Sequence, residues 1–289
     1  MGVLEVLFLT VFWAWVITAL LFLRTTLLPN LPLSQAPDLL GLPSETVSFD
    51  ASDGVRLEGW KITSSSERPW IILCHGVGSN RADLLDVAAG LHGAGFNLFA
   101  FDFRGHGGSA GRVTSFGWLE QRDLEGALAF LGRQPDIPAK SYGIYGISMG
   151  GAVALMVAAR DERLGAVALD SPHSNLDETL GRHLSLMYPA LPRVPFHAFI
   201  LWNYRLRFGV WPKALSPLES AKQLGSRPLL LVHGENDMRM PIQGAKDLLA
   251  VASGPKELWV VRGAGHLEGL GVSPSEYLGR VAGFFRGLG

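Results

Sequence analysis

The longest apolar run lies near the start of the chain, where residues 6–23 are hydrophobic apart from Thr10 and Thr18. At 1.5 Å per residue, about 18 helical residues just cross a hydrocarbon core of roughly 30 Å. A secretory signal peptide would need basic residues before the run and small residues at a cleavage site after it. Here Glu5 precedes the run and Arg24 follows it. We therefore predict an uncleaved transmembrane anchor over residues 1–24, with a signal peptide and a buried or interfacial helix as the alternatives.

The next stretch, residues 25–44, is rich in proline, which lacks the N–H that a helix or a central strand needs. Its prolines are Pro29, Pro32, Pro37 and Pro43. We expect an extended, semi-rigid linker that holds the rest of the chain close to a bilayer. Because Arg24 is the basic residue that flanks the apolar run, the positive-inside rule places that remainder in the cytoplasm.

From residue 45 onward the pattern predicts a layered sheet. Val47 and Phe49 alternate with polar neighbours up to a turn at Asp53-Gly54, and this alternation is typical of a β-hairpin with one solvated face. Later runs are apolar on both faces, as in the covered strands of a parallel sheet. They span residues 70–74, 98–103, 141–147, 166–169, 229–232 and 258–261. Helical patterns lie between them, so we predict a three-layer α/β domain over residues 45–289.

One insertion interrupts this alternation, between the strand that ends near Asp170 and the strand that begins at Leu229. It is too long for a crossover helix alone, and we predict a helical cap over about residues 172–215. Aromatic residues alternate there with arginine and lysine, and residues 179–213 hold no acidic residue. Either the aromatic side chains pack on the body of the domain, or the cap also contacts lipid, as amphipathic aromatic and basic segments do. The two interpretations are compatible.

The sequence Gly146-Ile147-Ser148-Met149-Gly150 stands where a predicted strand meets a predicted helix. The pattern Gly-x-Ser-x-Gly in this context is typical of a nucleophile elbow, a turn so tight that it requires residues without side chains around the serine. Such a turn raises the Ser148 hydroxyl above the sheet, close to the N–H groups of a helix N-terminus. The alternative is an ordinary glycine-rich turn, but the flanking elements favour a nucleophilic serine.

A serine hydroxyl needs a base within hydrogen-bond reach and a carboxylate that orients the base. Such groups gather at the carboxyl ends of the strands in open α/β sheets. His266 follows the last predicted strand in a glycine-rich loop, and we predict that it is the base. Asp237 and Asp170 both follow strands and either could orient it. We favour Asp237, because the order Ser148, Asp237, His266 is that of nucleophile, acid and base in the α/β-hydrolase pattern.

Two backbone donors are expected to stabilise the oxyanion of an acyl-transfer reaction. The N–H of Met149, directly after the nucleophile, is one, and the N–H of Val77 in the loop after the strand at residues 70–74 is the other. In the same region we interpret His75 as a loop organiser and Cys74 as a core residue. We expect the charges of the segment 102–107, Asp-Phe-Arg-Gly-His-Gly, to pair with each other.

The composition and charge of the chain limit which ligands and partners we expect it to bind. The formal net charge of −1 gives no basic field for nucleic acid, and the single cysteine forms no intramolecular disulfide. The spacing of histidines and carboxylates is not that of a metal site, and we expect no cofactor. The sequence does not indicate the oligomeric state.

These motifs, in this order, resemble the α/β-hydrolase superfamily and specifically membrane-anchored bacterial hydrolases of the serine aminopeptidase S33-like (Hydrolase 4) group. The matching pieces are His75-Gly76, the segment 102–107, the segment 146–150, the segment 234–237 and Gly265-His266. The resemblance implies an α/β-hydrolase fold with Ser148, Asp237 and His266 as its triad. A serine at the elbow argues against dehalogenases and epoxide hydrolases, and Val77 interrupts the four-glycine oxyanion motif of some lipases.

We therefore expect a serine hydrolase that cleaves small-molecule carboxylic esters, with an apolar or lipid-like acyl group, through an acyl-enzyme on Ser148. A serine peptidase that uses the same triad is the first alternative. An inactive, membrane-tethered binding module with a hydrolase fold is the second, since a fold alone does not settle function.

Overall fold

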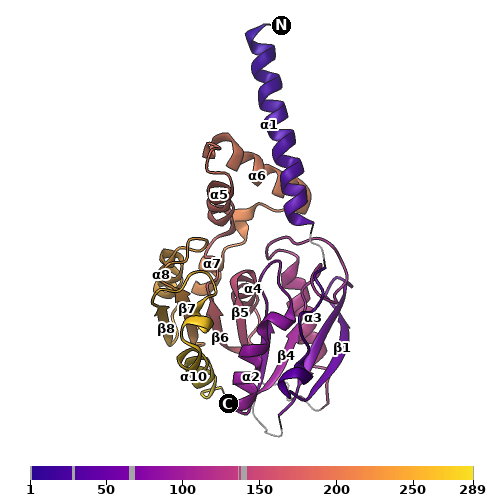
Figure 1. Ribbon diagram of the computed structural model, residues 1–289, viewed down its shortest axis with the longest axis vertical. Helices are drawn as coiled ribbons and strands as arrows, with labels where there is room; N and C mark the ends of the chain where they lie inside the picture. The colour runs from indigo at the N-terminus through magenta and orange to yellow at the C-terminus, as the bar shows by residue number, and fades with distance from the viewer. Residues whose placement is uncertain (1, 28–29, 65–68, 136, 138–141, 289) are drawn as a thin grey trace.

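The computed structural model describes residues 2–27, 30–64, 69–135, 137 and 142–288 (Figure 1). Pro29 of the predicted linker and the predicted first residue of the strand at 141–147 lie outside these residues. An eight-stranded sheet forms the centre of the molecule, in the order β1-β2-β4-β3-β5-β6-β7-β8. The strands are β1 Ser44–Asp50, β2 Arg56–Ile62, β3 Trp70–Cys74, β4 Asn97–Phe101, β5 Tyr142–Ile147, β6 Leu164–Asp170, β7 Leu229–Gly234 and β8 Lys256–Val261.

The sheet has the predicted mixture of pairings. β1 and β2 form the antiparallel hairpin, and β2 pairs antiparallel with β4. All pairs from β4 to β8 are parallel. The carboxyl ends of the parallel strands therefore meet at one edge of the sheet, which is where ligand sites form in such sheets.

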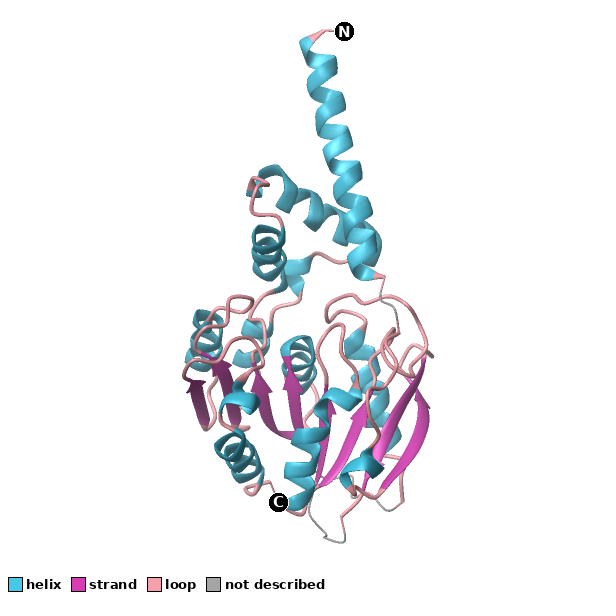
Figure 2. Cartoon of the chain, viewed as in Figure 1, coloured by secondary structure: helices cyan, strands magenta, loops and turns pink. Residues whose placement is uncertain are grey.

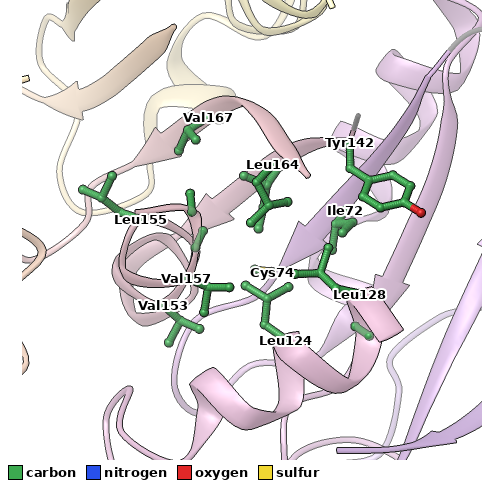
Figure 3. Close-up of a cluster of buried hydrophobic side chains, with 14 of the residues drawn as sticks. Ile72, Cys74, Leu124, Leu128, Tyr142, Val153, Leu155, Val157, Leu164 and Val167 are labelled. Atoms are coloured by element: carbon green, nitrogen blue, oxygen red, sulfur yellow. The ribbon is translucent and has the colours of Figure 1, made fainter. Parts of the chain in front are cut away.

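Helices cover both faces of the sheet, so the predicted three-layer fold is confirmed. The body helices are α2 Leu85–Gly93, α3 Glu120–Leu131, α4 Ser148–Ala158, α7 Pro217–Lys222, α8 Ile242–Val251, α9 Gly269–Val272 and α10 Pro274–Phe285, with a 3₁₀ turn, η2 Arg81–Leu84, before α2. One core lies between the sheet and α3, α4 and α8, where Cys74 is buried with Leu124 and Val153 (Figure 3). A second core fills the other face under α2 and α10.

The predicted cap insertion contains two helices, α5 Leu176–Met187 and α6 Arg193–Phe208, and a short 3₁₀ helix, η3 Pro212–Ala214. Asn175 caps α5 by accepting hydrogen bonds from the N–H groups of Asp177 and Glu178. The two helices stand above the carboxyl edge of the sheet (Figure 2). Tyr204 on α6 is fully buried and donates its hydroxyl to the carbonyl of Ser115, 2.7 Å away, which ties the cap to the body.

The apolar run at the start of the chain forms one helix, α1 Val3–Thr26, which projects beyond the cap (Figure 2). It is long and apolar enough to cross a bilayer, a property that signal sequences share. Its lower end is docked on α6, where Phe22 contacts the rings of Tyr204 and Phe208. The proline-rich segment after it includes a 3₁₀ helix, η1 Pro37–Leu40, and buries Pro37 and Leu42, so this part rests on the domain.

Candidate active site

Ser148 lies at the turn between β5 and α4, and its backbone is in the left-handed region with φ +51°. This conformation is strained for a residue with a side chain. The helix α4 begins at Ser148 itself. A Cβ atom on Gly146 would lie 2.7 Å from the carbonyl oxygen of Gly150, and one on Gly150 would overlap the carbonyl oxygens of Cys74 and His75. Both glycines of the motif are therefore required by close backbone approach.

The structure brings Ser148, His266 and Asp237 together from the ends of three strands. The Nε2 atom of His266 lies 3.1 Å from the Ser148 Oγ, and its Nδ1 lies 2.7 Å from Asp237 Oδ2. Because an ionised carboxylate only accepts hydrogen bonds, Nδ1 carries the proton and Nε2 is free to accept the serine hydroxyl. This is the arrangement that proton transfer from serine to histidine requires.

Asp237 is held in place by backbone donors. Its Oδ1 accepts the N–H groups of Arg239 at 2.9 Å and Met240 at 2.8 Å. Burial by itself would raise the pKa of Asp237, but the hydrogen bonds from His266 and Met240 outweigh it, so the pKa lies below its ordinary value. The carboxylate thus stays ionised beside the imidazole at neutral pH.

Asp170, the other carboxylate that the sequence offered, has different partners. Its Oδ2 accepts the hydroxyl of Tyr277 at 2.5 Å, and its Oδ1 accepts the hydroxyl of Ser171 at 2.8 Å. The Tyr277 hydroxyl is in turn 2.6 Å from that of Tyr145. Burial raises the pKa of Asp170. Asp170 therefore belongs to a buried hydroxyl network, while Asp237 holds the histidine.

The loop after β3 passes directly against the nucleophile. A Cβ on Gly76 would lie 3.4 Å from the Cβ of Ser148, and Val77 lines the same cavities as Ser148. Met149 lies in the first turn of α4, where N–H groups lack intrahelical partners. Val77 and Met149 thus both lie close to Ser148, and their role as oxyanion donors stays a prediction.

His75 organises this loop. Its Nδ1 donates to the carbonyl of Gly76 at 2.7 Å, and its Nε2 accepts the N–H of Phe103 at 3.0 Å. Burial and the neighbouring His106 hold the pKa of His75 well below its usual range, so the ring is neutral. The loop of β3 is in this way fastened to the loop of β4.

The expected pairing of charges within residues 102–107 is wrong. Asp102 Oδ2 pairs with Arg81 Nη1 at 2.7 Å, and Arg104 pairs with Asp123 at 2.6 Å and with Asp53 at 2.7 Å. The segment's two charged residues, Asp102 and Arg104, thus pair with residues of other segments rather than with each other. Neighbours in the sequence point in different directions here, because the turn after β4 separates their side chains.

Two cavities meet at Ser148. The larger has a volume of about 700 Å³ and runs between α1, α5 and the loop of Val77. Its walls are mostly carbon, and it includes Leu176, Leu180 and Leu184 of α5. The smaller, about 340 Å³, is more polar and is lined by His266, Arg239, Asp83 and Tyr277 among others.

Sequence reasoning missed three parts of this site. The sequence did not predict that α1 lines the larger cavity. It also did not indicate that His173 and the leucines of α5 line it. His173 lines the larger cavity, and neither ring nitrogen has a hydrogen-bond partner among the described residues. Burial lowers the pKa of His173 to about 4, so its ring is neutral. The leucines at positions 176, 180 and 184 recur every fourth residue, a helical signal that could have marked the wall.

Across the part of the chain that the structure describes, no three His, Cys, Asp or Glu side chains gather as they would around a metal ion.

Comparisons with known proteins show which family the chain resembles. The family model of serine aminopeptidase S33 (Hydrolase 4) matches residues 65–205. YqkD of Bacillus subtilis is 30% identical over 217 residues, which cover 74% of this chain and 70% of YqkD. YfhR of Escherichia coli is 29% identical over 230 residues, which cover 78% of this chain and 74% of YfhR.

Solved structures point the same way. The Pyrococcus furiosus esterase Pf2001 superposes with a TM-score of 0.76 at 28% identity, covering 90% of this chain and 97% of the esterase. The α/β-hydrolase GrgF of a Penicillium species shares the fold, with a TM-score of 0.67 at 23% identity over 85% of this chain and 98% of GrgF. The chain is therefore a hydrolase of the α/β-hydrolase superfamily and belongs to the serine aminopeptidase S33 (Hydrolase 4) family.

Proposed function

We propose that this protein is a membrane-anchored serine esterase that hydrolyses carboxylic esters of apolar acyl groups through an acyl-enzyme on Ser148. The observation that carries the proposal is the hydrogen-bonded series Asp237, His266, Ser148 at the floor of a carbon-lined cavity. The name of Pf2001, an esterase, supports the same reaction class.

The reaction follows from the positions of the groups. The Ser148 oxygen attacks the ester carbonyl while its proton passes to Nε2 of His266, and Asp237 stabilises the imidazolium. The N–H groups of Val77 and Met149 donate hydrogen bonds to the carbonyl oxygen and stabilise the negative charge that develops on it. His266 then returns the proton to the departing alcohol. Water, activated by the same histidine, cleaves the acyl-enzyme and releases the acid.

The two cavities divide the substrate between them. The larger, carbon-lined cavity suits the acyl chain, and the smaller cavity, with Arg239 and Asp83 at its walls, suits the alcohol part. An ester whose carbonyl lies at Ser148 would extend into both. Medium-chain esters should therefore be better substrates than acetate esters.

The membrane part of the proposal rests on α1 and on the surface of the cap. Val194, Trp202 and Leu206 on α6 are exposed apolar residues, and arginines at 193, 205 and 207 lie among them. Aromatic and basic residues side by side favour the headgroup region of anionic bilayers. We place the active site on the cytoplasmic side, as Arg24 indicates.

The family description names aminopeptidases, so peptide hydrolysis is the second candidate. A site for a substrate amino terminus needs free carboxylates, and the smaller cavity offers Asp83 and Asp170. Asp83 accepts the hydroxyl of Ser79 at 2.6 Å, and Asp170 is engaged by Tyr277 and Ser171. We therefore rank esters first, and comparing aminoacyl esters with the matched aminoacyl amides separates the two reactions.

Labelling with a fluorophosphonate tests the nucleophile. The full chain in mild detergent should be labelled at Ser148, as located by mass spectrometry of the modified peptide. Ser148→Ala should lose both the label and ester hydrolysis, while Ser253→Ala, at an exposed serine that lines neither cavity, should keep them. A folded wild-type protein that is not labelled would contradict the proposal and favour an inactive binding module.

A further inference from the structure

We propose that α1 is a wall of the substrate site as well as an anchor, and that the acyl chain of a membrane lipid ester reaches Ser148 along it from the bilayer. This inference rests on the proposed function. It assigns the substrate class, lipid esters held in the membrane, and names the helix face that selects their chain length.

The larger cavity joins α1 to the nucleophile. Its lining includes Ser148 and Met149 at one end and α1 residues as far as Thr10 at the other. The α1 residues that line it recur at every third or fourth position, as in Ala14, Ile17 and Leu21. That spacing places them on one face of the helix. One face of α1 therefore looks into the cavity.

The cavity follows α1 over a membrane-scale length. From Thr10 to Thr25, fifteen residues of helix span about 22 Å at 1.5 Å per residue. One leaflet of a hydrocarbon core that is roughly 30 Å thick measures about 15 Å. The cavity wall thus extends from the catalytic domain well into the segment of α1 that is apolar enough to lie in the bilayer.

The face of α1 toward the cavity is apolar in effect, although it carries threonines. The hydroxyl of Thr10 donates to the carbonyl of Val6 at 2.8 Å, and that of Thr18 donates to Ala14 at 2.7 Å. Thr25 donates to Phe22 in the same way at 2.9 Å. Because these hydroxyls bond to the backbone of their own helix, the threonines offer little polarity to a ligand. The wall suits a hydrocarbon chain.

The position of the cap explains why the chain should come from the bilayer. Trp202 and Leu206 on α6 are exposed beside arginines, which places the cap at the headgroup level if α1 spans the membrane. The far end of the cavity, at Thr10 and Trp13, then lies at the depth of acyl chains. A lipid tail already packed beside α1 could enter without crossing water.

A matched pair of tryptophan substitutions tests the inference. Leu21 lines the cavity, while its neighbour Leu20 does not and is 61% exposed. Leu21→Trp should lower kcat/KM for palmitoyl esters by about tenfold or more and leave butyryl esters within about twofold, because added bulk shortens the cavity. Leu20→Trp should change neither. The measurement uses p-nitrophenyl esters of increasing chain length with the full chain in phosphatidylcholine–phosphatidylglycerol nanodiscs.

Ala14→Trp sharpens the test. It adds bulk about 10 Å further from the catalytic domain than Leu21, seven residues along the helix. It should therefore spare medium chains and impair only the longest. If Leu21→Trp misfolds and loses all activity, the chain-length profile of Ala14→Trp still tests whether α1 lines the acyl site.

The outcomes separate this inference from the proposed function. If the wild type is labelled at Ser148 and hydrolyses esters, but the Leu21, Ala14 and Leu20 variants share its chain-length profile, the inference is overturned and the esterase stands. If the wild type is neither labelled nor active on any ester, both fall.

Discussion

The sheet edge and the roof above it are built in different ways. At the edge, Ser148, Asp237 and His266 each follow a strand, and backbone contacts fix their positions. The roof consists of α1, α5 and α6, which pack on one another through a few side chains such as Phe22 and Tyr204. Under the proposed function, the edge holds the reacting groups in place and the roof determines which acyl chains fit. Perturbations should therefore act on rate at the edge and on selectivity at the roof.

The largest expected effect is a fall in kcat when Asp237, the proposed partner of the catalytic histidine, is replaced. Asp237→Asn should lower kcat by about 10⁴-fold, since an amide favours the wrong histidine tautomer. Asp170→Asn is the matched change on the neighbouring strand, and because Asp170 bonds to Tyr277 and Ser171, it should lower kcat by less than about tenfold. Ester kinetics on the two purified variants measure this. Equal losses would mean that Asp170 shares the role of acid.

The next effect is on the stability of the elbow. Gly150→Ala should cost about 3 kcal/mol of unfolding free energy, because its Cβ would overlap the carbonyls of Cys74 and His75. Gly279, in α10, has nothing within 4 Å of a built Cβ, so Gly279→Ala should stabilise by about 0.5–1 kcal/mol. Denaturant unfolding of both variants checks the contrast. A Gly150→Ala protein as stable as wild type would show that the elbow is looser than described.

A substitution in the roof should loosen the roof without loosening the central sheet. Phe22 is 5% exposed against Tyr204 and Phe208, and Phe22→Ala should weaken the docking of α1 by about 3 kcal/mol. We expect faster hydrogen exchange in α6 and unchanged exchange in the central strands. Phe12→Ala, at a ring that is 42% exposed, is the control and should leave α6 unchanged. Equal loosening of the sheet would mean that roof and edge are one cooperative unit.

The last effect is a pH dependence of stability that comes from His173, which lines the larger cavity. Its folded pKa is lowered to about 4 by burial and by the charge of His183, whereas an unfolded histidine has a pKa of about 6.5. As pH falls through this window the unfolded state binds a proton first, so the folded state loses up to about 3 kcal/mol.

His173→Leu should remove this loss, and its stability advantage over wild type should grow between pH 7 and pH 4. Urea unfolding at several pH values measures it, with His92→Leu as a histidine control outside the cavity. Parallel pH profiles for wild type and His173→Leu would contradict the assignment.

The sequence predicted the sheet edge better than it predicted the roof. The meeting of Ser148, Asp237 and His266 could be predicted because each residue lies in a short motif after a strand. The partners of Asp102 and Arg104 were not readable, since Arg81 and Asp123 are set by tertiary packing across loops. The role of α1 in the cavity was also missed. Its small residues Thr10, Ala14 and Thr18 recur every fourth position, but hydropathy alone hides such a face.

One measurement tests the whole account. A long-chain alkyl fluorophosphonate with a photoreactive diazirine at the chain end is allowed to react with the full chain in nanodiscs, and is then illuminated and mapped by mass spectrometry. The phosphorus atom should become attached to Ser148, and the chain end should crosslink to the peptide that contains α1. Failure to modify Ser148, or crosslinks confined to the smaller cavity around Leu270, would contradict it.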